Sequence, residues 1–118
     1  MSQPPAIDPE AIENLRALDT EGDNTFLREI VGIFLQDTPL RLAELHTSLA
    51  AGDVTRFARA AHSLKGSASN LGAIRVSAAA AKLEQVARHE GLAQVAGLIP
   101  PLEAEFTLAK SELEALIA

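Results

Sequence analysis

The sequence has no cysteine, tryptophan or tyrosine, and phenylalanine is its only aromatic residue. The lack of cysteine excludes disulfides and thiolate metal sites. Aromatic residues favour β-strands, whereas alanine and leucine, which supply much of the 47% apolar content, favour helices. The composition therefore predicts an all-α protein. Its 118 residues are enough for one domain with a single hydrophobic core.

Basic residues are also scarce, and long apolar runs are absent. The 10 lysines and arginines are outnumbered by 16 aspartates and glutamates, giving a net charge of −6. This balance argues against nucleic-acid binding, because phosphate backbones are bound by clustered lysine and arginine. No segment approaches the ~20 apolar residues of a membrane span, and residues 1–9 lack a signal-peptide pattern. We therefore expect a cytoplasmic, monomeric protein that binds neither nucleic acid nor membranes.

We expect the chain to consist of a flexible lead-in, residues 1–7, and one domain, residues 8–118. The domain begins with Asp8-Pro9-Glu10, which provides an N-cap, a proline at the first helical position and an acid in the first turn. This pattern predicts a short helix over residues 9–18. The side chains expected on its core face are Ile12, Leu15 and Leu18.

Four long amphipathic helices follow, because apolar residues recur at three- and four-residue steps between short breaks. We expect these helices over about residues 25–50, 54–71, 74–89 and 98–116. Residues 21–24 are expected to end the short N-terminal helix and to cap the first long helix near Thr25. Long helices with short connections predict an antiparallel up-down-up-down four-helix bundle with a short extra N-terminal helix. The expected core residues, helix by helix, are Leu27, Val31, Phe34, Leu42, Leu45 and Leu49; Val54, Phe57, Ala61, Leu64, Ala68 and Leu71; Val76, Ala79, Ala80, Leu83 and Val86; and Leu98, Leu102, Phe106, Ala109, Leu113 and Leu116.

Prolines interrupt two of these helices. Pro39 is expected to kink the helix over residues 25–50, because proline lacks the amide hydrogen that a helix interior requires. The pair Pro100-Pro101 either begins the last helix or kinks it near its first turns.

The helix over residues 54–71 carries His62 outside its apolar stripe. His62 shares a neighbouring, solvent-accessible stripe with the candidate access or docking residues Arg59, Gly66 and Ser69. Glycine inside a helix costs roughly 1 kcal/mol relative to alanine, so Gly66, one turn after His62, indicates a place where a bulky partner approaches the ring. An exposed imidazole is mostly neutral near pH 7 and keeps one nucleophilic lone pair.

Lys65, three residues after His62, brings an ammonium group beside the ring. There it can neutralise the oxygens of a phosphoryl group attached to the imidazole. The remaining histidines, His46 and His89, lack such a setting and are interpreted as surface residues. The histidines show no i, i+4 pairing and no clustered carboxylates, so no metal site is expected. No base accompanies the serines near His62, which are interpreted as packing or polar residues: Ser63, Ser67 and Ser69.

The segment from His62 to Gly72, with the sequence HSLKGSASNLG, resembles the signature of the histidine phosphotransfer (HPt) family, H-x-x-K-G-x-x-x-x-x-G. Gly72 is also interpreted as a helix terminator. The similarity extends over nearly the whole chain, including Thr38-Pro39, Ala51-Gly52-Asp53 and Leu83-Glu84.

The resemblance implies that His62 accepts a phosphoryl group from the aspartyl phosphate of a receiver domain and passes it to another receiver. Such receivers belong to response regulators or hybrid histidine kinases. It also implies that Lys65 helps to hold the phosphate and that Gly66 leaves room for the receiver. We expect no cofactor on this chain and Mg²⁺ only on the partner receiver. The chain is expected to be a phosphocarrier and not a kinase, because it has no ATP-binding motif.

The resemblance further implies a side chain on the following helix near the phosphohistidine. Glu84 and Gln85 are both candidates. A carboxylate there would repel phosphate unless it accepted a hydrogen bond from the other ring nitrogen of His62. The role therefore stays open between these two residues.

The stretch around His62 is basic although the chain is acidic. A local charge of +3 between Gly52 and Val76 would complement an acidic receiver, although ordinary solvated helix charges explain it equally well. The basic residues counted are Arg56, Arg59, Lys65 and Arg75, against Asp53.

Two other functions fit a helical bundle: a phosphorylation-independent scaffold that docks a receiver or kinase, and the dimerisation bundle of a sensor kinase. The scaffold is disfavoured because docking alone does not need an in-helix glycine beside a histidine. The kinase bundle is disfavoured because it would be a two-helix hairpin, which differs from the four helices expected here.

Overall fold

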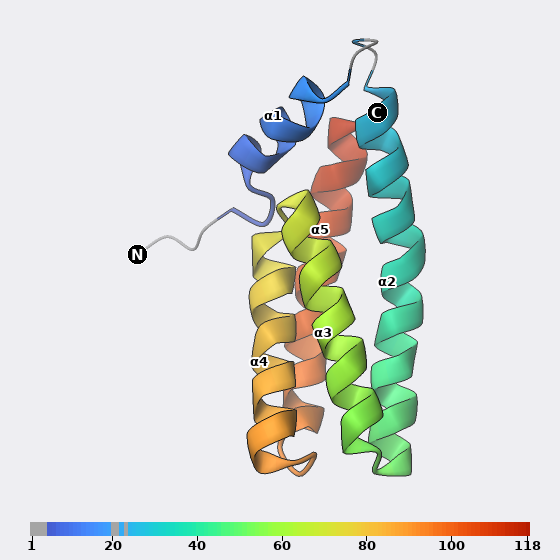
Figure 1. Cartoon of the computed structure of the whole chain (residues 1–118), viewed down its shortest axis with the longest axis vertical. Helices are drawn as coiled ribbons and strands as arrows, with labels where there is room; N and C mark the ends of the chain where they lie inside the picture. The colour runs from blue at the N-terminus through green and yellow to red at the C-terminus, as the bar shows by residue number, and fades with distance from the viewer. Residues whose placement is uncertain (1–4, 20–21, 23) are drawn as a thin grey trace.

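The chain folds into one short and four long α-helices with a single 3₁₀ turn (Figure 1). The structure is a computed structural model that describes residues 5–19, 22 and 24–118. The long helices lie side by side and alternate in direction, and the short helix lies across one end of the bundle (Figure 1). The predicted all-α, up-down-up-down bundle is therefore confirmed. The elements are α1 (Pro9–Ala17), α2 (Thr25–Ala51), α3 (Val54–Leu71), α4 (Ile74–Glu90), the 3₁₀ helix η1 (Val95–Leu98) and α5 (Ile99–Leu116).

Most of the helices begin where the sequence predicted. The Asp8 carboxylate caps α1 by accepting a hydrogen bond from the amide of Glu10 at 3.0 Å, and Asp53 caps α3 from the amide of Arg56 at 3.1 Å. α5 begins at Ile99 with its prolines in the first turn, so the pair begins this helix. The short 3₁₀ turn before it was not predicted.

The start and middle of α2 differ in part from the expectation. Asn24 precedes the helix in a left-handed conformation, and its side chain makes no capping hydrogen bond. Glu21 and Asp23, the acidic residues of the predicted cap, lie outside the described residues. The helix continues through Pro39 as one element, and the kink expected there stays a prediction.

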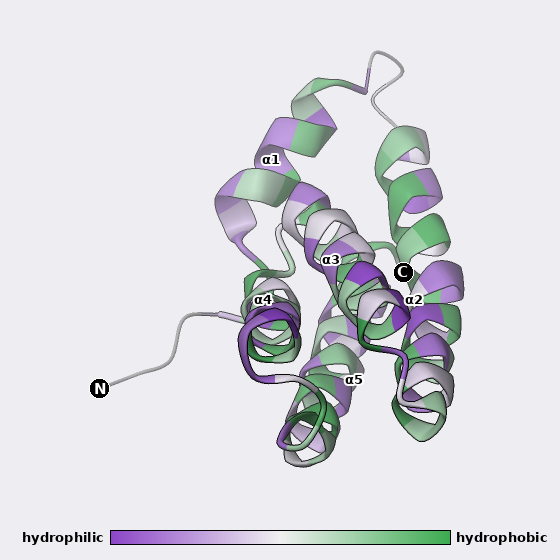
Figure 2. Ribbon diagram, turned by 60° about the horizontal axis from the view of Figure 1, so that its bottom comes forward, coloured by the Kyte–Doolittle hydropathy of each residue, from purple (hydrophilic) through white to green (hydrophobic). Residues whose placement is uncertain are grey.

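Each long helix carries both apolar and polar residues along its length (Figure 2), and the apolar ones form one core. All predicted core residues are buried or partly buried except two. Leu18 is 65% exposed because it follows the last turn of α1, and Val54 is 38% exposed because it opens α3. Both predictions were wrong because a side chain at a helix end has neighbouring turns on one side only.

The short helix α1 packs against the end of α3 through Gly72. The amide of Asp8 donates a hydrogen bond to the carbonyl of Gly72 at 2.8 Å. Gly72 has a φ of +80°, and a Cβ there would lie 2.5 Å from the Cβ of Ala11. Its role thus exceeds that of a helix terminator, because it also makes room for α1.

The packed part of the chain begins before the predicted boundary at Asp8. Ala6 and Ile7 are buried, and Ile7 belongs to the core. Pro5 is exposed, and residues 1–4 of the predicted flexible lead-in lie outside the described residues. Among the helices of the described part, none is long and apolar enough to cross a membrane.

Candidate functional site

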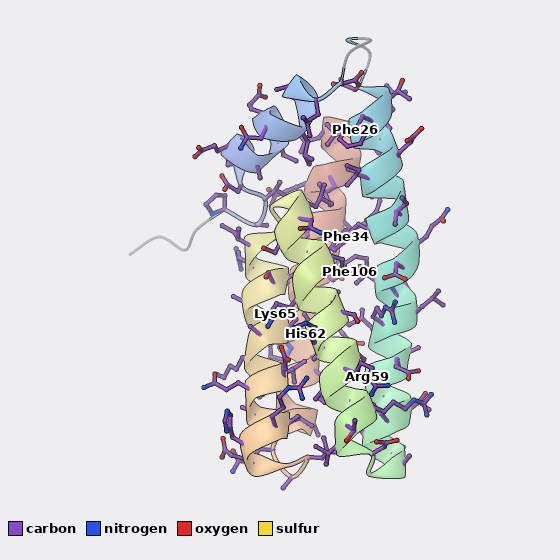
Figure 3. The ribbon with its side chains drawn as sticks, viewed as in Figure 1. Phe26, Phe34, Arg59, His62, Lys65 and Phe106 are labelled. Atoms are coloured by element: carbon purple, nitrogen blue, oxygen red, sulfur yellow. The ribbon has the colours of Figure 1, made fainter. Side chains whose placement is uncertain are left out.

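His62 lies in the middle of α3 with its side chain directed out of the core, beside α4 (Figure 3). Its side chain is 61% exposed, whereas Ala61 and Leu64 are fully buried. This is the off-stripe position that the sequence predicted. A partner can therefore reach the imidazole from solvent.

One edge of the imidazole is held by Glu84, from α4. The Nδ1 atom of His62 lies 3.0 Å from Oε2 and 3.2 Å from Oε1 of Glu84. An ionised carboxylate has no proton to donate, so the proton in this hydrogen bond belongs to Nδ1. In the neutral ring the lone pair is then on Nε2. The arrangement fixes which ring nitrogen carries the lone pair.

Two cations hold the same carboxylate. Nζ of Lys65 donates to Oε1 of Glu84 at 2.8 Å, and Nε of Arg88 donates to Oε2 at 3.0 Å. Burial acts to raise the pKa of Glu84, whose side chain is only 12% exposed. The hydrogen bonds from Lys65 and Arg88, the charge of Lys65 and the hydrogen bond from His62 outweigh burial and lower this pKa to about 2. Glu84 is therefore ionised at neutral pH.

The site is built across the interface of two helices. His62 and Lys65 are three residues apart on α3, and Glu84 and Arg88 are four apart on α4, so each pair lies on one helix face. The hydroxyl of Ser77 donates to the carbonyl of Lys65 at 3.2 Å and ties α4 to α3 near the site. The helix register thus brings four charged or titratable side chains together.

Gly66 is an exposed helical residue one turn after His62. A Cβ built on it would meet no atom within 4 Å. Packing inside this chain therefore does not require glycine there. The space beside the imidazole is open, as the approach of a partner would need.

Among the described residues, two others on this face form no hydrogen bond with the ring. Arg59 and Ser69 are exposed, and neither forms a hydrogen bond with His62. Gln85 is exposed too, whereas its neighbour Glu84 is the residue that reaches the imidazole. Of the two candidates on α4, Glu84 is thus the one that contacts the imidazole, and its role beside a phosphohistidine stays a prediction.

The local charge of +3 around His62 is mostly compensated in three dimensions. Acidic residues from other helices pair with three of the four basic residues, and in the described residues Arg59 alone of the four has no ion-pair partner. A count along the sequence overestimates the positive field on this face, because it omits acids that lie close only in the fold. The pairs are Arg56 with Glu44, Lys65 with Glu84, and Arg75 with Glu105.

The other candidate side chains take structural positions. His46 is exposed and lies 3.1 Å from Glu103, and His89 lies exposed in the last turn of α4. The hydroxyl of Ser67 donates to the carbonyl of Leu64 at 3.2 Å, as a polar helix residue commonly does. Within residues 5–19, 22 and 24–118, no cluster of three histidine, cysteine or acidic side chains is suited to hold a metal ion.

Arg88 is the residue that sequence reasoning missed. It lies four residues after Glu84 and pairs with it across one helical turn. The spacing alone could have indicated this pair once Glu84 was chosen over Gln85. The HPt-like motif, residues 62–72, ends before α4 and holds no signal for Arg88.

Comparison with known proteins agrees with the geometry. A family model described as the Hpt domain matches residues 29–118. The crystal structure of histidine-containing phosphotransfer protein B (HptB) from Pseudomonas aeruginosa PAO1 is similar over 98% of this chain and 96% of that chain, with a TM-score of 0.87 and 29% sequence identity. No curated protein matches the chain significantly by sequence. The chain therefore belongs to the Hpt domain family, whose members carry phosphoryl groups in phosphorelays.

Proposed function

We propose that this chain is a phosphorelay protein in which Nε2 of His62 accepts a phosphoryl group from the aspartate of one receiver domain and passes it to another. The hydrogen bond between Nδ1 of His62 and Glu84 carries this proposal, because it leaves the lone pair on Nε2 of an exposed side chain. Family membership supports the phosphotransfer role, and the receivers are the partners that this family implies.

The transfer forms one bond and breaks one bond. The Nε2 lone pair of His62 attacks phosphorus, the bond between phosphorus and the aspartate oxygen breaks, and the aspartate leaves as a carboxylate. The ring keeps its proton on Nδ1 and becomes a phosphorylated imidazolium. Glu84 stabilises this positive charge, as the carboxylate of a catalytic triad stabilises its imidazolium. The protonated ring is also a good leaving group for onward transfer.

Lys65 is the candidate counter-ion for the phosphoryl oxygens. It lies three residues after His62, and its Nζ already reaches the site through Glu84 at 2.8 Å. A charge-assisted hydrogen bond from an ammonium to a phosphoryl oxygen is roughly twice as strong as a neutral one. We expect the receiver to supply Mg²⁺ and most of the remaining charge stabilisation, because this chain contributes the nucleophile and one lysine.

Open space on α3 supports direct contact with a folded partner. Gly66 has no side chain and has open space around it, and the exposed side chain of His62 lies one turn before it on the same helix. We further propose that the chain acts as a cytoplasmic monomer and carries the phosphoryl group without kinase activity of its own.

The experiment that tests the proposal is transfer from a receiver. The chain is incubated with a receiver domain carrying a radiolabelled aspartyl phosphate, and the label is tested for lability in acid and stability in base. We expect acid-labile, base-stable label that disappears in His62→Gln and persists in His46→Gln and His89→Gln, two exposed histidines that serve as matched controls. Label that survives in His62→Gln would overturn the assignment. Receiver binding without any label would indicate a docking scaffold instead.

A further inference from the structure

Glu84 has more positive partners than its single charge requires. Lys65 occupies Oε1 at 2.8 Å, and Arg88 occupies Oε2 at 3.0 Å. Among the described residues these are the lysine and arginine side chains that contact this carboxylate. Lys65 comes from α3 and Arg88 from α4, so the carboxylate lies between one cation of each helix.

Phosphorylation of His62 creates competition for Lys65. A phosphoryl group on Nε2 adds a strong anion beside the lysine, and a lysine side chain with four rotatable carbons can turn from Glu84 toward it. Glu84 would then lose one of its two charged partners. Leaving a nearly buried carboxylate without a cation costs free energy. If Lys65 were the one cation on Glu84, this cost would oppose its movement to the phosphoryl group.

Arg88 can avoid the free-energy cost of an unpaired Glu84, because it can stay paired with this carboxylate when Lys65 turns away. It lies on the same helix as Glu84, one turn away, and its pairing with Oε2 is independent of the position of Lys65. Its side chain is 53% exposed and belongs to α4, whereas His62 belongs to α3. Arg88 is thus placed to hold the carboxylate while the lysine leaves.

We propose that Arg88 is a positioning residue for phosphotransfer: it keeps Glu84 charged and in place on Nδ1 of His62 when Lys65 turns to the phosphoryl oxygens. This role rests on the proposed function of His62. Arg88 acts through Glu84 and Lys65 and does not touch the phosphoryl group. Among the described residues, removal of its charge leaves Lys65 as the one lysine or arginine that pairs with Glu84, and this holds Lys65 there.

The test is the rate of phosphoryl transfer from a labelled receiver to the chain, measured in a single turnover at saturating receiver. We expect Arg88→Gln to slow transfer about tenfold, since a charge-assisted hydrogen bond is lost, without changing the Kd for the receiver. Arg88→Lys should restore most of the rate because it keeps the cation. Lys82→Gln, which removes an exposed cation from the same helix, is the matched control and should match the wild type.

The Glu84→Gln variant, which has no charge at position 84, shows whether Arg88 acts through Glu84 or through a general effect on the structure. In Glu84→Gln there is no carboxylate to neutralise, so adding Arg88→Gln should cause no further loss of rate. Urea denaturation confirms that each variant is folded under the assay conditions.

Three outcomes overturn the role of Arg88 while leaving the proposed function intact. The first is an Arg88→Gln variant as fast as the wild type, and the second is an equal loss in the Glu84→Gln background. The third is an equal loss in Lys82→Gln, because the effect would then come from the general charge of α4. A wild-type chain that takes no label on His62 would overturn the proposed function and this role together.

Discussion

The Glu84 carboxylate accepts a hydrogen bond from Nδ1 of His62 across the interface of α3 and α4, at 3.0 Å. This relationship joins a buried, ionised side chain to an exposed imidazole. It assigns the ring proton to one nitrogen and the lone pair to the other. The tautomer of His62 therefore depends on a residue that belongs to a different helix.

Removal of this acceptor should slow phosphotransfer. In Glu84→Ala the imidazole is free to rotate and to carry its proton on Nε2, so the transfer rate should fall about tenfold or more. A shift of the ring ¹⁵N resonances should report the change of tautomer. Gln85→Ala, which alters the exposed neighbouring residue, should have the wild-type rate and tautomer. Unchanged ¹⁵N shifts in Glu84→Ala would contradict the assigned role of Glu84.

The same carboxylate should make stability depend on acid pH. The pKa of Glu84 is lowered from 4.5 to about 2 in the folded chain, so between these values the unfolded state binds more protons. Its stabilising contribution is thus complete above pH 4.5 and is lost as the pH falls toward 2. Urea denaturation at pH 7 and pH 3 should show a smaller loss for Glu84→Gln than for the wild type. An equal loss in both would show that Glu84 is not the group responsible.

Substitutions at Gly66 should separate stability from access. Because a Cβ there meets nothing within 4 Å, Gly66→Ala should stabilise the helix by about 1 kcal/mol. Gly66→Gln should remain folded but obstruct a receiver, with a transfer rate at least about tenfold lower. Phosphorylation by the small donor phosphoramidate serves as the control and should be nearly unchanged. A Gly66→Gln variant that reacts normally with receivers would show that this space is not used for docking.

Gly72 should be intolerant of a side chain for two separable reasons. Its φ of +80° disfavours any other residue, and a Cβ would lie 2.5 Å from that of Ala11. Gly72→Ala should lower the free energy of unfolding by about 2 kcal/mol or more. Gly52 has a φ of +69° but open space around it, so Gly52→Ala should cost only about 1 kcal/mol. Equal losses in the two variants, measured by urea denaturation, would mean that the contact with α1 contributes nothing.

Much of the fold could be predicted because its signals are local. The caps at Asp8 and Asp53 and the spacing of apolar residues within each helix require no knowledge of tertiary structure. Leu18 and Val54 were placed wrongly in the core because periodicity does not show whether another element covers a helix end. The contact of Gly72 with Ala11 joins residues distant in sequence, so no local pattern could indicate it.

The site could be predicted in part for the same reason. His62 and Lys65 are on one helix, and their spacing fixes their common face. The choice between Glu84 and Gln85 depends on the rotation of α4 against α3, which the sequence alone does not specify. The compensation of the basic residues near His62 also depends on contacts between helices, so it appeared only in the structure.

The position of the phosphoryl group on the imidazole tests the central claim most directly. The wild-type chain, ¹⁵N-labelled in histidine and phosphorylated by a receiver, is examined by ¹H, ¹⁵N and ³¹P magnetic resonance. We predict one phosphohistidine, at His62, with phosphorus coupled to Nε2 and a proton retained on Nδ1. Phosphorus on Nδ1, or on His46 or His89, would contradict the account.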